Sequence, residues 1–335
     1  MTYHALILSD EWDKTFLQSD AVEHEKIVFD TNFGNTLAAD LYKPKNATGK
    51  LAALAISGPF GAVKEQASGF YAQTMAERGF LTLAFDPSFT GESSGQPRYM
   101  ASPDINTDDF MSAIDYLSCR DDVDPDRIGI IGICGWGGIA LNAAASDPRI
   151  KATIASTMYD MTRIGGNGYF DEEDSAQARN EARRAMAQNR LHETQTGERF
   201  RAGGVAETVP ESAPQFMHDY WDYYKTPRGY AARSLNSNDG WDVTGTQAYA
   251  DTRFLTYIDE IEAPVMVMHG EKAHSRYMGE TAYEKMAAGP YAANKQLVIV
   301  PGAVHCDLYD GGNGNFINWD MITTFFTESL SKTNN

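Results

Sequence analysis

The sequence has few cysteines, few basic residues and no long apolar run. Its three cysteines, Cys119, Cys134 and Cys306, form neither a metal-ligand spacing nor a disulfide framework, so we expect a reduced, cytoplasmic setting. Lys and Arg number 28 against 46 Asp and Glu, a net charge of −18, which argues against nucleic acid or an anionic membrane as a partner. The apolar stretches are too short to cross a bilayer, and residues 1–11 lack the basic and apolar regions of a signal peptide.

What the sequence does contain is an alternation of strand and helix patterns in a chain of 335 residues. Apolar runs predict strands, and most are followed by helical spacing, which is typical of a mostly parallel sheet covered on both faces. A turn at residues 32–35 predicts a hairpin near the start, and a short helix is expected around residues 12–17. The predicted strands cover residues 26–31, 36–44, 51–57, 80–86, 127–133, 150–157, 264–270 and 296–302.

This alternation is interrupted for about ninety residues. Residues 161–250 carry few strand signals, a polar helical stretch at 171–190 and an aromatic stretch at 213–225. An interruption of this length is too long for a simple loop. We therefore predict an α/β core formed by residues 1–160 and 251–335, with residues 161–250 inserted as a helical lid.

The most informative stretch runs from Arg127 to Ala140. An apolar, β-branched run meets four glycines within residues 132–138, with Cys134 among them, and strong helix formers follow. A strand, a sharp turn with one reactive side chain and a helix are the layout of a nucleophile elbow. Two other interpretations are an inert core cysteine and a glycine-rich turn that holds a phosphate.

A nucleophilic cysteine needs a base, and His305 follows the predicted strand 296–302 at the sheet edge where open α/β sheets place their sites. The acid that would orient this histidine has two candidates, Glu271 after strand 264–270 and Asp160 after strand 150–157. We favour Glu271. The backbone N–H groups of Gly135 and Phe60 are the expected oxyanion hole, because Pro59 has no N–H.

Five motifs together resemble the α/β-hydrolase superfamily: Gly58-Pro-x-Gly, Asp86-x-x-x-x-Gly-Glu-Ser, Gly132-Ile-Cys-Gly-x-Gly-Gly, Gly270-Glu-Lys-Ala-His-Ser-Arg-Tyr and Pro301-Gly-Ala-Val-His. Within it the chain resembles dienelactone-hydrolase-like enzymes, near the group that contains fungal polyketide transferases. The resemblance covers most of residues 20–330 and implies acyl transfer through a covalent intermediate without a metal or organic cofactor. Two departures are Trp136, where a small residue is usual, and Cys306 beside His305, and the position where an aspartate is commonly expected is Ala273.

These observations predict a cysteine-dependent acyl hydrolase or acyltransferase for an ester, thioester or lactone. Its partner would be a small-molecule acyl substrate, contacted by Trp136, Trp221 and Tyr224. The alternatives are a nucleotide-binding oxidoreductase, with Asp160 on a ribose, and a hydrolase fold used only for binding. The glycines do not spell G-x-G-x-x-G, which disfavours the oxidoreductase. The oligomeric state stays open, with a homodimer as one option.

Overall fold

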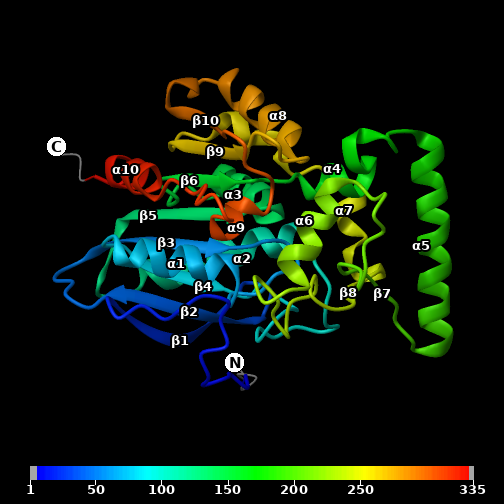
Figure 1. Ribbon diagram of the computed structural model, residues 1–335, viewed down its shortest axis with the longest axis horizontal. Helices are drawn as coiled ribbons and strands as arrows, with labels where there is room; N and C mark the ends of the chain where they lie inside the picture. The colour runs from blue at the N-terminus through cyan, green and yellow to red at the C-terminus, as the bar shows by residue number, and fades with distance from the viewer. Residues whose placement is uncertain (1–5, 332–335) are drawn as a thin grey trace.

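The computed structural model describes residues 6–331, and an eight-stranded sheet forms its centre (Figure 1). Its order is β1-β2-β4-β3-β5-β6-β9-β10. The pairs β1–β2 and β2–β4 are antiparallel, and the other neighbours are parallel. The strands are β1 Val22–Asp30, β2 Thr36–Pro44, β3 Leu51–Ser57, β4 Leu81–Phe85, β5 Val123–Ile133, β6 Thr153–Ser156, β9 Val265–Gly270 and β10 Lys295–Val300. The predicted mostly parallel sheet is therefore confirmed.

Two apolar cores lie on the two faces of the sheet, as the twofold alternation of strand side chains requires. On β3, Leu54 and Ile56 join one core, and Ala53 and Ala55 join the other. The first core is covered by helices α1 and α10, and the second by α2, α3 and α8. These helices are α1 Ala67–Glu77, α2 Pro103–Ser118, α3 Gly135–Ser146, α8 Arg276–Ala287 and α10 Trp319–Ser329, and a short α9 spans Asp307–Asp310.

Most of the chain between β6 and β9 forms a group of short elements and one long helix at one end of the sheet (Figure 1). Its long helix α5 stands farthest from the sheet in this view and has no buried residue. A two-stranded antiparallel sheet, β7–β8, was not foreseen. The elements are α4 Met161–Asn167, η1 Tyr169–Asp171, α5 Ala176–Thr196, β7 Arg201–Gly203, α6 Gln215–Tyr224, β8 Gly240–Asp242, η2 Thr244–Thr246 and α7 Ala248–Asp251.

One local prediction was wrong. Residues 12–17 form no helix, because their polar groups bond elsewhere. The Thr15 N–H donates to the carbonyl of Glu65 at 2.9 Å, and the Trp12 indole N–H donates to the carbonyl of Phe16. The pattern expected to resume near Tyr257 does so with the 3₁₀ helix η3 Leu255–Glu260, followed by β9 and α8, and a second 3₁₀ helix, η4 Ala292–Asn294, directly precedes β10. The two ends of the predicted α/β core, residues 1–5 and 332–335, lie outside the described residues. Within residues 6–331, no helix combines the length and the apolar character needed to cross a bilayer.

Candidate active site

Cys134 lies at a sharp turn between β5 and α3, with its backbone in the left-handed region at φ 58°. A non-glycine residue in that region is strained, and such strain gathers at functional sites. The turn is so tight that a Cβ on Gly132 would lie 2.0 Å from the Trp136 carbonyl oxygen. Glycine is therefore required there, which explains the glycine-rich motif and confirms the strand–turn–helix arrangement.

The thiol of Cys134 lies among polar groups. The backbone N–H groups of Gly135 and Phe60 and the hydroxyl of Tyr309 lie close enough to it to favour its ionised form. Burial raises the pKa of the Cys134 thiol, and these three groups lower it only in part. The thiol is therefore protonated at neutral pH and must lose its proton during a reaction. The two predicted oxyanion donors, Gly135 and Phe60, are brought together at the sulfur.

The loop that carries Phe60 is held from the inserted segment. Asn236 donates from its side chain to the Phe60 carbonyl at 2.8 Å and from its backbone to the Gly61 carbonyl at 3.1 Å. The Ser234 hydroxyl donates to the same Gly61 carbonyl at 3.0 Å. Gly61 has φ +87°, and a Cβ there would meet the Asn236 side chain at 2.3 Å. The N–H of Phe60 is therefore positioned by residues about 170 positions away in the sequence.

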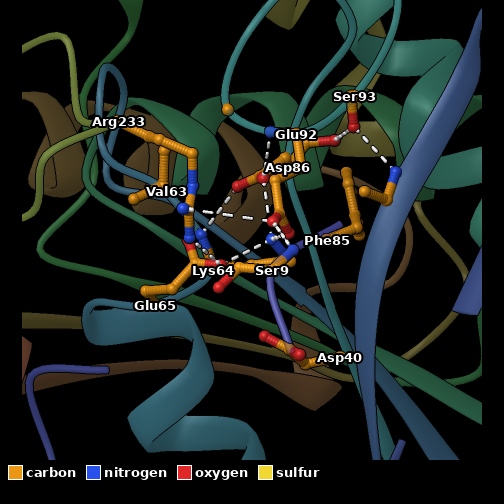
Figure 2. Close-up of polar contacts among 12 residues, drawn as sticks. Ser9, Asp40, Val63, Lys64, Glu65, Phe85, Asp86, Glu92, Ser93 and Arg233 are labelled. Atoms are coloured by element: carbon orange, nitrogen blue, oxygen red, sulfur yellow. Dashed lines mark hydrogen bonds and ion pairs between the residues drawn. The ribbon is translucent and has the colours of Figure 1, made fainter. Parts of the chain in front are cut away.

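Just beyond Phe60, Lys64 is fully buried among three acids (Figure 2). Its Nζ lies 2.6 Å from Glu65, 3.0 Å from Asp86 and 2.6 Å from Glu92. Burial alone would lower the pKa of Lys64, but the neighbouring acids raise it well above its usual value. Arg233 of the insertion pairs with Glu65 at 2.9 Å.

The three acids have the spacing of a cation site, and the Lys64 ammonium group already bonds to all of them. Asp86 also explains the Asp86-x-x-x-x-Gly-Glu-Ser motif, because its carboxylate accepts from the backbone N–H groups of Lys64 and Glu92 at 2.8 Å each. A Cβ on Gly91 would lie 2.2 Å from that carboxylate. The motif therefore binds two loops together.

His305 is 1% exposed and lies next to Tyr309. Its Nε2 lies 2.9 Å from the Tyr309 hydroxyl, which also contacts the Cys134 thiol. Its Nδ1 lies 2.8 Å from each of the hydroxyls of Thr157 and Ser275. Burial, aided by the neighbouring His274 and His269, holds the pKa of His305 well below its usual value. The imidazole is therefore neutral, and Tyr309 links it to the thiol.

Neither expected acid contacts His305 among the described residues. The Glu271 carboxylate accepts from the N–H of Gly302 at 2.8 Å on the exposed side of its loop. Asp160 caps α4, and its carboxylate accepts from the N–H groups of Thr162 and Arg163 at 2.9 and 3.0 Å. Hydroxyl groups therefore occupy the place beside Nδ1 where the sequence predicted a carboxylate. Because the Asp160 carboxylate caps α4, it is not placed to bind a ribose, as the oxidoreductase interpretation would require.

A cavity of about 540 Å³ opens beside Cys134. Its walls come from the loop of Phe60, from the residues just after β6, and from α4, α5, β7, α6, β8 and α7. Of the three expected substrate contacts, Tyr224 lines this cavity. Trp136 is instead fully buried in the core against Phe85 and Phe110, because the turn directs its ring under α3. Trp221 faces outward and donates to the Glu207 carbonyl.

Three residues of the site were not foreseen from the sequence, namely Tyr309, Thr157 and Ser275. Tyr309 follows His305 by four positions, a spacing that places two side chains on one face of a helical turn and could have signalled the pair. Thr157 directly follows β6 and has φ 44°, an outlier for a β-branched residue, and its hydroxyl lies beside His305. No sequence signal marks Ser275.

Comparison with known proteins places the chain in a family. The model of the X-Pro dipeptidyl-peptidase (S15) family matches residues 34–306. The chain belongs to this family. It is also 53% identical over 327 residues to the uncharacterized protein PA2218 of Pseudomonas aeruginosa, covering 97% of this chain and 86% of that one. The crystal structure of PA2218 matches with a TM-score of 0.92 over 98% of this chain and all of the other, at 52% identity.

Two more distant proteins bear on the resemblance found in the sequence. The α/β hydrolase GrgF from Penicillium shares the fold of this S15-family chain, with a TM-score of 0.73 at 20% identity over 92% of this chain and 99% of that one. The polyketide transferase claH of Penicillium crustosum is 35% identical over 133 residues, which cover 39% of this chain and 43% of claH. The resemblance to α/β hydrolases is thus confirmed, and the protein is an enzyme of the hydrolase and acyltransferase type.

Proposed function

We propose that this S15-family protein is a cysteine-dependent acyl hydrolase or acyltransferase that acts on an ester, thioester or lactone. One observation carries the proposal: the Cys134 thiol lies at a strained elbow, within hydrogen-bonding reach of two backbone N–H groups and of the Tyr309 hydroxyl, which bonds in turn to a neutral His305. These are the donors, nucleophile and base that acyl transfer needs.

In the proposed first step, the substrate carbonyl oxygen accepts hydrogen bonds from the N–H groups of Gly135 and Phe60, and the sulfur attacks the carbonyl carbon. The thiol proton passes to the Tyr309 oxygen while the Tyr309 proton passes to Nε2 of His305. Nδ1 keeps its hydrogen and donates it to the Thr157 or Ser275 hydroxyl. Tyr309 thus acts as a proton relay, and the two hydroxyls position the imidazole in place of Glu271 or Asp160.

The tetrahedral intermediate then collapses as the bond from carbon to the leaving oxygen or sulfur breaks. The leaving group receives the proton held by His305 through Tyr309, and the acyl group stays on Cys134 as a thioester. Water or another acceptor attacks this thioester, gives its proton back along the same route and restores the thiol. We further propose that residues 161–250 act as the lid, because they build most of the cavity wall.

The test is turnover of p-nitrophenyl hexanoate combined with mass spectrometry of the intact protein. We expect Cys134→Ala to lose turnover by several orders of magnitude, and a quenched reaction of the unmodified enzyme to show one acyl group on Cys134. Cys119→Ser is the matched control, because this exposed thiol at the end of α2 is remote from the cavity. Wild-type turnover by Cys134→Ala, or an acyl group on another residue, would refute the proposal.

A further inference from the structure

We infer that the cavity selects an uncharged acyl group that carries a hydrogen-bond acceptor, and that the Tyr224 hydroxyl recognises this acceptor. The inference rests on the proposed function and specifies its substrate class. It starts from the composition of the cavity wall. Among the described residues that line the cavity there is no Asp, Glu, Lys, Arg or His.

The polar groups in the wall are hydroxyls and amides, and they stay neutral. Burial raises the pKa values of Tyr159, Tyr220 and Tyr224 well above the usual value for tyrosine. A charged acyl group would therefore lose its hydration without meeting a counter-charge, which is costly in a buried apolar site. The net charge of −18 adds to this penalty for a carboxylate. An α-ammonium group, as on the amino terminus of a peptide, would find no carboxylate in the wall either.

Tyr224 is the polar side chain of this wall that matters most for recognition. It is 1% exposed, it lines the cavity, and its hydroxyl has no hydrogen-bond partner of normal geometry among the described residues. Asn236 is a polar neighbour whose amide donates to the Phe60 carbonyl, and a contact from its second N–H to the Tyr224 oxygen would still leave the hydroxyl hydrogen of Tyr224 to donate. A buried hydroxyl without a partner is costly, so a ligand oxygen that accepts from it stabilises the complex.

The far part of the cavity suits an apolar chain. There α4 contributes Ile164, and α5 contributes Ala182 and Met186, which are apolar residues on a mostly polar helix. The occupant therefore has an oxygen near the reacting carbonyl, where Tyr224 and Tyr309 stand with ring centroids 6.3 Å apart, and an apolar remainder that extends toward α5.

The test compares p-nitrophenyl hexanoate with its 4-oxo and 5-oxo derivatives and with the half-ester of adipic acid, which carries a carboxylate. We expect kcat/KM to be about tenfold higher for an oxo ester than for hexanoate, the net effect of one hydrogen bond. The adipate half-ester should react at least about 100-fold more slowly than hexanoate. Tyr224→Phe should abolish the preference for the oxo ester.

Tyr42→Phe is the matched control, because the Tyr42 hydroxyl is also buried and has no partner within residues 6–331, but it lies in the core away from the cavity. It should keep the oxo preference. Met186→Lys should bring a cation to the wall and raise the rate with the adipate half-ester, whereas Leu191→Lys, on the exposed face of α5, should not. Equal rates with charged and neutral esters, or an oxo preference that survives in Tyr224→Phe, would overturn the inference.

Binding separates this inference from the proposed function. Hexanamide, 5-oxohexanamide and the monoamide of adipic acid cannot acylate the enzyme readily, and titration calorimetry with Cys134→Ala measures their affinities without turnover. Tighter binding of the oxo amide, lost in Cys134→Ala/Tyr224→Phe, supports the inference even if no ester is cleaved. Affinities that do not distinguish the three amides overturn it while leaving the function of Cys134 to its own test.

Discussion

The buried ammonium group of Lys64 gives the sharpest prediction about stability. Lys64→Met keeps the length of the side chain but leaves Glu65, Asp86 and Glu92 without their shared counter-charge. Removing one partner of a buried ion network typically costs about 3–5 kcal/mol, because the remaining charges are buried and uncompensated. Arg233 and Lys26 still pair with Glu65 and Glu92. We therefore expect a loss near the lower end, about 3 kcal/mol, in the free energy of unfolding at about pH 7.

The loss should also depend on pH, and Glu92 shows the sign. Burial opposes ionisation of Glu92, yet Lys64 and Lys26 lower its pKa to about 2 from a usual 4.5. In the unmodified protein its stabilising contribution is therefore present above about pH 4.5 and is lost as the pH falls toward 2. Without Lys64 the pKa of Glu92 should rise, and protonation then relieves the penalty. The difference between variant and parent should shrink as the pH is lowered from about 7 to about 5.

Urea denaturation followed by fluorescence measures both effects. Lys43→Met is the matched control, because Lys43 pairs with Asp122 at 2.9 Å near the surface, with side chains 32% and 24% exposed. Such a pair is worth at most about 1 kcal/mol. A loss in Lys64→Met no larger than in this control, or one that stays constant between about pH 7 and about pH 5, would refute the assignment of Lys64 as the counter-charge of the three acids.

Three further predictions concern the site. Tyr309→Phe removes the relay, so kcat for p-nitrophenyl hexanoate should fall about 10²- to 10⁴-fold with little change in KM; an unchanged kcat would mean that the proton takes another route. Because the pKa of His305 lies well below its usual value, kcat/KM of the parent enzyme should stay level between about pH 8 and about pH 6. Ser275→Asp should raise the pKa of His305 and make kcat/KM fall toward low pH. Such a fall in the parent enzyme would contradict a neutral imidazole. Burial raises the pKa of Cys134, so iodoacetamide should label the exposed Cys119 first, as peptide mapping can show, and earlier labelling of Cys134 would contradict a protonated thiol.

The features that could be predicted from the sequence are those that a short stretch of chain determines. The elbow at Cys134 follows from an apolar strand, close-packed glycines and a helix within residues 127–146, and the structure has each of them. The β1–β2 hairpin follows in the same way from the turn at residues 32–35, where Gly34 has φ +80°. Continuous apolar runs likewise place the parallel strands, because burial on both faces requires them.

The partners of His305 could not be predicted, because they depend on which loop ends meet in space. Thr157 and Ser275 follow neighbouring strands β6 and β9, and only the strand order brings both hydroxyls to one nitrogen. Glu271 was the favoured acid by its position in the loop, but its longer side chain turns back to satisfy the Gly302 N–H. The pairing of β7 with β8 joins three-residue strands about forty positions apart, which leaves no periodic signal.

The inserted segment is thus more than a cover over a finished site. Ser234 and Asn236 fix the backbone of Gly61 and Phe60, and Arg233 pairs with Glu65 on the same loop. The N–H of Phe60 therefore has its position only when this part of residues 161–250 is folded against the core. Tyr224, which belongs to the same segment, lines the cavity, and its ring lies near that of Tyr309. Because one segment both holds the N–H that would stabilise the oxyanion and lines the acyl pocket, a change in its packing should alter the rate of acyl transfer together with the choice of acyl group.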